Sequence, residues 1–134
     1  MESKNSFKTR SKILINGKKY IYFDINKIAD YFKFDLKSVP FSVKILLENL
    51  IRNEDNESIN AYMISSFCSK LIVKDESDEA FEIAFLPTRV LMQDFTGVPA
   101  LADLAAMRDA LKNKRINPNK INPLSRVDLV IDHS

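Results

Sequence analysis

The stretch Ala84–Asp109, AFLPTRVLMQDFTGVPALADLAAMRD, decides the fold that the sequence predicts. An apolar, β-prone run over Arg89–Met92 ends in the polar pair Gln93–Asp94, and a Thr96–Gly97 turn follows. A helix-prone run then opens near Pro99, a residue type that suits the first turn of a helix. This order predicts a strand, a loop and a helix.

A second apolar run, Val127–Ile131, ends in the same way, with Asp132, His133 and Ser134. A helical crossover between two strands of one sheet makes the strands parallel and brings their carboxyl ends to one edge. Ligands of open parallel sheets bind outside this edge. Gln93, Asp132 and His133 are therefore candidate parts of one site.

An adjacent aspartate and histidine suit proton transfer, because a carboxylate stabilises the imidazolium and imidazole titrates near neutral pH. Neighbouring residues of a strand point to opposite faces, so Asp132 need not be the carboxylate that touches His133. A solvated surface histidine is the simpler interpretation of an isolated pair. Gln93 offers an amide donor and acceptor, although a glutamine at a strand end is as often structural.

The preceding part of the chain predicts a hairpin, three helices and a further strand. Asn16–Gly17, between two β-prone runs, is typical of a tight hairpin turn. Apolar residues at helical spacing indicate the helices. The hairpin strands are expected at Ile13–Ile15 and Tyr20–Phe23, the helices from a cap at Asp24 or Asn26 through Phe32, over Val43–Arg52 and over Glu57–Leu71, and the further strand over Phe81–Phe85.

Composition indicates one soluble globular domain, with 134 residues of which 46% are hydrophobic. The 20 basic and 18 acidic residues leave a net charge of only +2, too small to indicate a nucleic-acid partner. The basic residues near the N-terminus are interpreted as a flexible basic tail over residues 1–11 and a solvated turn, rather than a nucleic-acid contact. They are Lys4, Lys8, Arg10, Lys12, Lys18 and Lys19.

The single cysteine, Cys68, cannot form an intramolecular disulfide or hold a metal cluster by itself. Its place on the apolar face of a predicted helix indicates a buried, inert thiol and a reducing, cytoplasmic setting. No apolar run approaches the roughly 18 residues that a membrane-spanning helix requires. A membrane partner is therefore not expected.

Three motifs resemble the N-terminal part of aconitate hydratase, in the bacterial A-type branch that includes cytosolic aconitase and the iron regulatory proteins. They are LLENLIRNED at Leu46–Asp55, RVLMQDFTGVPA at Arg89–Ala100 with DLAAMRD at Asp103–Asp109, and INPL at Ile121–Leu124 with VDLVIDHS at Val127–Ser134. The resemblance implies an α/β fold: a partial three-layer aconitase-like domain with an N-terminal hairpin, helices and a βαβ parallel-sheet unit. Residues 1–134 would be the truncated N-terminal part of the first α/β domain.

The resemblance also implies a reaction, the dehydration of citrate to cis-aconitate and its rehydration to isocitrate, with a [4Fe-4S] cluster as Lewis acid. Gln93 would contact the substrate, and His133 with Asp132 would belong to the acid–base group that handles the departing hydroxyl. The family's cluster cysteines, serine base, substrate-binding arginines and C-terminal domain would lie beyond Ser134, and Cys68 matches none of the cluster ligands. We therefore expect an N-terminal fragment that binds no cluster and is inactive by itself.

Two other interpretations stay open. The chain fits a non-catalytic piece that complements a separately encoded remainder, or an RNA-contacting module, although its small and scattered positive charge gives RNA little support. The 2-methylcitrate dehydratases carry similar motifs, so these residues do not decide the substrate. The segment Asn56–Ala80 also diverges from the tryptophan-containing segment expected in the family, and the chain has no tryptophan.

Overall fold

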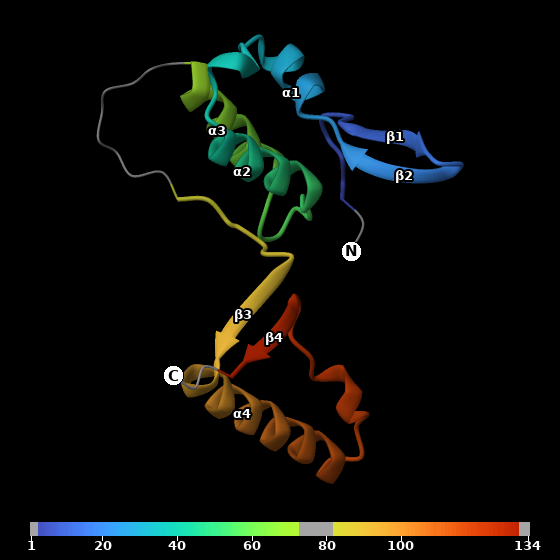
Figure 1. Ribbon diagram of the computed structural model, residues 1–134, viewed down its shortest axis with the longest axis vertical. Helices are drawn as coiled ribbons and strands as arrows, with labels where there is room; N and C mark the ends of the chain where they lie inside the picture. The colour runs from blue at the N-terminus through green and yellow to red at the C-terminus, as the bar shows by residue number, and fades with distance from the viewer. Residues whose placement is uncertain (1–2, 73–81, 132–134) are drawn as a thin grey trace. The chain divides into compact units, whose positions relative to one another are not determined.

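The chain divides into a first unit, Met1–Leu86, and a second unit, Pro87–Ser134. The computed structural model describes residues 3–72 and 82–131 of them (Figure 1). The described part of the first unit holds an antiparallel hairpin and three α-helices, and that of the second holds a parallel strand pair and one long α-helix. This mixed α/β composition agrees with the predicted fold class of a partial aconitase-like domain.

The N-terminal hairpin forms as the sequence predicts. Strand β1, Arg10–Ile15, pairs antiparallel with β2, Lys18–Phe23, so that Ile15 lies opposite Lys18. Asn16 and Gly17 form the turn with φ angles of 48° and 76°. Two consecutive residues in the left-handed region fit the right-handed twist of the strands, which is why an asparagine–glycine pair is favoured there.

The helix α1, Ile25–Phe32, starts where the sequence predicts, because the Asp24 side chain accepts a hydrogen bond from the backbone N–H of Asn26 at 3.0 Å. It ends at Lys33, whose φ of 60° is left-handed. A short 3-10 turn, η1, Leu36–Ser38, leads to α2, Phe41–Arg52.

The core of the first unit is built by α1, α2 and α3, the last spanning Ala61–Ile72. The stripe predicted for α2 is the buried one, with Leu47, Leu50 and Ile51 fully buried. The remaining fully or nearly fully buried members of this core are Ile28, Ile59, Ile64, Phe67 and Cys68.

Two predictions about the first unit are corrected. The helix predicted from Glu57 begins at Ala61, because the Asp55 carboxylate accepts the backbone N–H groups of Glu57 and Ile59, each at 2.9 Å, and holds them in a turn. The strand predicted over Phe81–Phe85 is wrong in its described part, since residues 82–85 form no strand.

The segment expected as a flexible tail makes defined contacts in its described part. The backbone N–H groups of Lys4 and Ser6 donate to the backbone oxygen and the Oε2 of the buried Glu54, at 3.0 and 2.9 Å. Ser3 Oγ donates to the Ile51 carbonyl oxygen at 2.9 Å. Thr9 is buried, and β1 begins one residue later.

In the second unit, β3, Arg89–Gln93, leads directly into α4, Asp94–Asn113, which Figure 1 draws below the two strands. After a 3-10 turn, η2, Pro118–Lys120, the chain forms β4, Arg126–Val130. Strands β3 and β4 pair in parallel, with Gln93 opposite Val130. The predicted strand–helix–strand crossover is confirmed.

The start of this helix was predicted too late. Thr96 and Gly97 lie in the first turn of α4 rather than in a loop, and Pro99 lies inside the helix. The helix starts early because side chains of its first turn bind nearby backbone groups: Asp94 Oδ1 accepts the Phe95 N–H at 2.9 Å, and Thr96 Oγ1 donates to the Gln93 carbonyl oxygen at 3.2 Å.

Among residues 3–72 and 82–131, no helix has both the length and the apolar character to cross a bilayer.

Candidate functional site

The carboxyl end of β3 places Gln93 at the edge of the parallel pair. Gln93 is the last residue of the strand and lies opposite Val130, the last residue of β4. Its backbone is fixed on one side by the strand pairing and on the other by the first turn of α4, through Thr96. Gln93 is exposed at this edge.

The other predicted site residues, Asp132, His133 and Ser134, lie outside the described residues. In the sequence, Asp132 follows Val130 by two positions, so the described structure ends just short of it. The structure therefore describes the Gln93 part of the predicted site alone, and the proximity of Gln93 to His133 stays a prediction.

A charged pair sits away from this edge. Arg89 contacts Asp128 across the two strands, and Arg126 Nε lies 3.3 Å from the same carboxylate. The hydrogen bond from Arg89 is the largest influence and holds the pKa of Asp128 below its usual range. Desolvation, the next largest influence, opposes it, and the charges of both arginines add to the lowering. Since both arginines are exposed, we interpret these ion pairs as surface contacts between the strands that contribute little to stability.

A hollow of about 920 Å³ lies in the second unit between α4, β4 and the connection that leads to β4. Its lining is mainly apolar and includes Met92, Leu101, Leu104, Leu124 and Leu129. Leu124 is 97% exposed. Gln93 is not among the lining residues, so the hollow is an uncovered apolar face and does not coincide with the predicted polar site.

Arg108, on α4, was not singled out by the sequence as a functional residue. Its Nε donates to the Ile121 carbonyl oxygen at 3.0 Å, and its guanidinium also contacts the Asn122 side chain. These bonds hold the connection against the helix. The sequence gave no signal of this contact, because the partner lies 13 residues further along the chain.

The described residues do not fit an iron–sulfur cluster. Among residues 3–72 and 82–131, no group of three or more His, Cys, Asp and Glu side chains could hold a metal ion. Burial raises the pKa of the Cys68 thiol to about 12, so this thiol is protonated at neutral pH, whereas a cluster ligand is a thiolate. The prediction of a buried Cys68 is confirmed.

We expect Cys68 to resist alkylation by iodoacetamide at pH 8 in the folded chain and to react fully in urea.

Because the pKa of the folded Cys68 thiol lies above its ordinary value of 9.0, the stability that this thiol contributes is complete below pH 9 and is lost as pH rises toward about 12. Urea unfolding at several pH values, compared between wild type and Cys68→Ala, measures this loss. Equal pH dependence in the two proteins would contradict it.

The family model of the aconitase family (aconitate hydratase) matches residues 64–134. Aconitate hydratase A of Legionella pneumophila is 46% identical over 130 residues, which are 97% of this chain and 14% of the relative. Aconitate hydratase A of Bradyrhizobium diazoefficiens and that of Pseudomonas aeruginosa are each 46% identical over all 134 residues, again 14% of the relative.

The chain thus spans about 14% of the length of these relatives. The matched region of the family model includes β3, α4 and β4, the strand–helix–strand unit that carries Gln93 at its carboxyl edge. The resemblance seen in the sequence motifs is confirmed over the whole chain, and the chain belongs to the aconitase family (aconitate hydratase).

Proposed function

We propose that this chain supplies one wall of the active site of an aconitase-type hydro-lyase, which converts citrate to isocitrate through cis-aconitate. The observation that carries the proposal is the parallel pairing of β3 and β4 inside the family-matched region, since it brings Gln93 to the ligand-binding edge of the sheet. Citrate is the proposed substrate, rather than 2-methylcitrate, because the similar relatives are named aconitate hydratase A.

In this proposal, the Gln93 side chain binds a carboxylate or hydroxyl group of the substrate, for which its amide has both a donor and an acceptor. His133, with Asp132, takes part in proton transfer to the departing hydroxyl. The parallel register supports this division of roles, because Gln93 lies opposite Val130 and Asp132 follows Val130 by two positions.

We further propose that the chain is catalytically inactive by itself and acts with a polypeptide that carries the rest of a family enzyme. The described residues offer no ligand set for the family's iron–sulfur cluster. The uncovered apolar hollow of the second unit also supports an additional covering polypeptide, since soluble proteins rarely leave a contiguous apolar face open to water.

The test is a chimera in which this chain replaces the corresponding segment of the Legionella pneumophila aconitate hydratase A. After cluster reconstitution, the chimera is expected to form cis-aconitate from citrate, measured by ultraviolet absorbance, whereas the isolated chain is expected to form none. Gln93→Ala in the chimera should lower kcat/KM for citrate by about 10- to 100-fold, the effect of losing a hydrogen bond to a charged group.

Lys112→Ala is the matched control, because Lys112 is an exposed residue in the last turn of α4 and lies away from the carboxyl edge. It should leave kcat/KM unchanged. A chimera with an assembled cluster but wild-type kcat/KM in Gln93→Ala would contradict the role of Gln93. Turnover of citrate by the isolated chain would contradict its proposed inactivity.

A further inference from the structure

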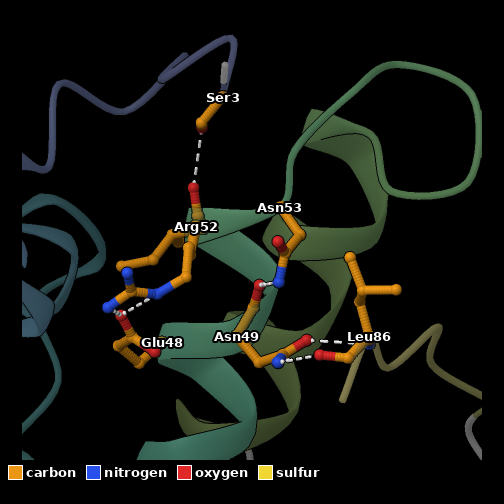
Figure 2. Close-up of polar contacts among 7 residues, drawn as sticks. Ser3, Glu48, Asn49, Arg52, Asn53 and Leu86 are labelled. Carbon is orange, nitrogen blue, oxygen red and sulfur yellow. Dashed lines mark hydrogen bonds and ion pairs between the residues drawn. The ribbon is translucent and has the colours of Figure 1, made fainter. Parts of the chain in front are cut away.

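The side chain of Asn49, in the middle of the buried face of α2, binds one backbone unit twice. Asn49 Nδ2 donates to the Leu86 carbonyl oxygen at 2.8 Å, and Asn49 Oδ1 accepts from the Leu86 N–H at 3.1 Å (Figure 2). Asn49 is only 6% exposed. The two bonds reproduce the pattern by which a neighbouring strand would bind a residue, but here a helix supplies them.

The helix itself does not need this side chain. The Asn49 carbonyl oxygen, in the last turn of α2, accepts a hydrogen bond from the Nδ2 of Asn53 at 2.9 Å (Figure 2). It also accepts one from the backbone N–H of Asn53 at 3.1 Å. The Asn49 amide group, by contrast, reaches a residue 37 positions away. A buried polar side chain with both of its polar atoms used in this way is costly to replace, because the Leu86 groups would lose their partners.

Leu86 lies where the chain leaves the first unit. It is the last residue of the first unit. Shortly before it, Ile83 and Ala84 pack against the core cluster, whereas the side chain of Leu86 is exposed. Strand β3 begins three residues later, at Arg89. The backbone bonds of Asn49 therefore hold the last residue of the first unit, while the apolar contacts hold Ile83 and Ala84.

We propose that Asn49 is a positioning residue, which binds the backbone of Leu86 and thereby orders the lead-in to β3, the strand that ends at Gln93. The importance of this order for a reaction rests on the proposed function, because Gln93 is the residue proposed to contact substrate. The positioning itself is independent of catalysis. It can be measured in this chain alone.

The experiment is site-resolved amide hydrogen exchange by NMR on the 134-residue chain and on Asn49→Asp. At pH 7 the aspartate keeps an acceptor for the Leu86 N–H but loses the donor for the Leu86 carbonyl, and it buries a charge. We expect exchange protection to fall by about tenfold or more at the Leu86 amide.

Acidification should rescue this variant. Burial beside a carbonyl oxygen raises the pKa of an aspartate above its ordinary value of about 3.9. The protonated form then dominates in the folded chain as pH falls toward 4, and its O–H donates to Leu86 in place of the lost N–H. Protection, corrected for the intrinsic exchange rate, should return toward wild type at pH 4 in Asn49→Asp.

Asn49→Ala serves as a second variant, which removes both bonds without burying a charge, and it should lose protection equally at both pH values. Asn53→Asp is the matched control, because it makes the same chemical change one turn further along the same helix end and does not contact Leu86. It should leave Leu86 and β3 as protected as in wild type. Wild-type protection of the Leu86 amide in Asn49→Ala would overturn the proposal, whether or not the chimera is active.

Discussion

Leu50→Ala is expected to lower the free energy of unfolding of the first unit by about 2–5 kcal/mol. Leu50 is fully buried on the apolar stripe of α2, inside the cluster formed with α1 and α3. The loss combines the transfer free energy of the removed carbons with the cavity that they leave, because the neighbouring helices can close only part of it. Urea unfolding followed by circular dichroism measures the loss.

Ile45→Ala is the control for this prediction. Ile45 belongs to the same helix, but its side chain is 62% exposed, so its truncation leaves no cavity. A change within about 0.5 kcal/mol is expected, as for most surface substitutions. Equal destabilisation by both variants would show that α2 does not bury the face that the structure assigns to it.

The parts of the fold that sequence predicts well are those set by local chemistry. The hairpin follows from Asn16 and Gly17, which adopt the left-handed conformation that the turn needs. The first helix follows from the Asp24 cap, and the second from its apolar periodicity. The parallel pairing of β3 and β4 follows from the handed crossover that α4 provides.

One failed prediction lies beside a long-range contact, whereas the wrong starts of α3 and α4 lie beside local side-chain hydrogen bonds. The apolar residues of Phe81–Phe85 resemble a strand, yet the neighbouring Leu86 is bound by the Asn49 side chain of a helix. One signal of this contact was present, because Asn49 lies three residues after Leu46 and one before Leu50, on the buried face of α2. A buried asparagine at such a position requires a partner, although the sequence does not say which.

The candidate site was predictable only as far as the sheet edge. Parallel strands fix the end of β3 as the place where Gln93 lies, and the structure confirms that part. The proposed role of Gln93 combines its place at the sheet edge with the family resemblance, which alone assigns it a contact with substrate. The roles of Asp132 and His133 rest on the same resemblance.

The second large loss of stability is expected on replacement of Gly97. The sequence predicts a turn at this glycine, but in the structure it is buried in the first turn of α4, where the helix closely approaches the strands. A Cβ atom at this position would lie 2.1 Å from Leu129 Cδ1 and 3.2 Å from Met92 Cβ. Gly97→Val is therefore expected to destabilise the second unit by about 1–3 kcal/mol, as overpacked sites do.

The clash with Leu129 makes this prediction testable by a double-mutant cycle. Leu129→Ala removes the atom that a valine at position 97 would meet, so it should reduce the cost of Gly97→Val, and the two changes together should cost less than their sum. Ala102→Val, at an exposed position of the same helix, measures the helix-propensity cost of valine alone. Hydrogen exchange at the β4 amides gives the stabilities, and strict additivity would mean that α4 and β4 are not packed through Gly97.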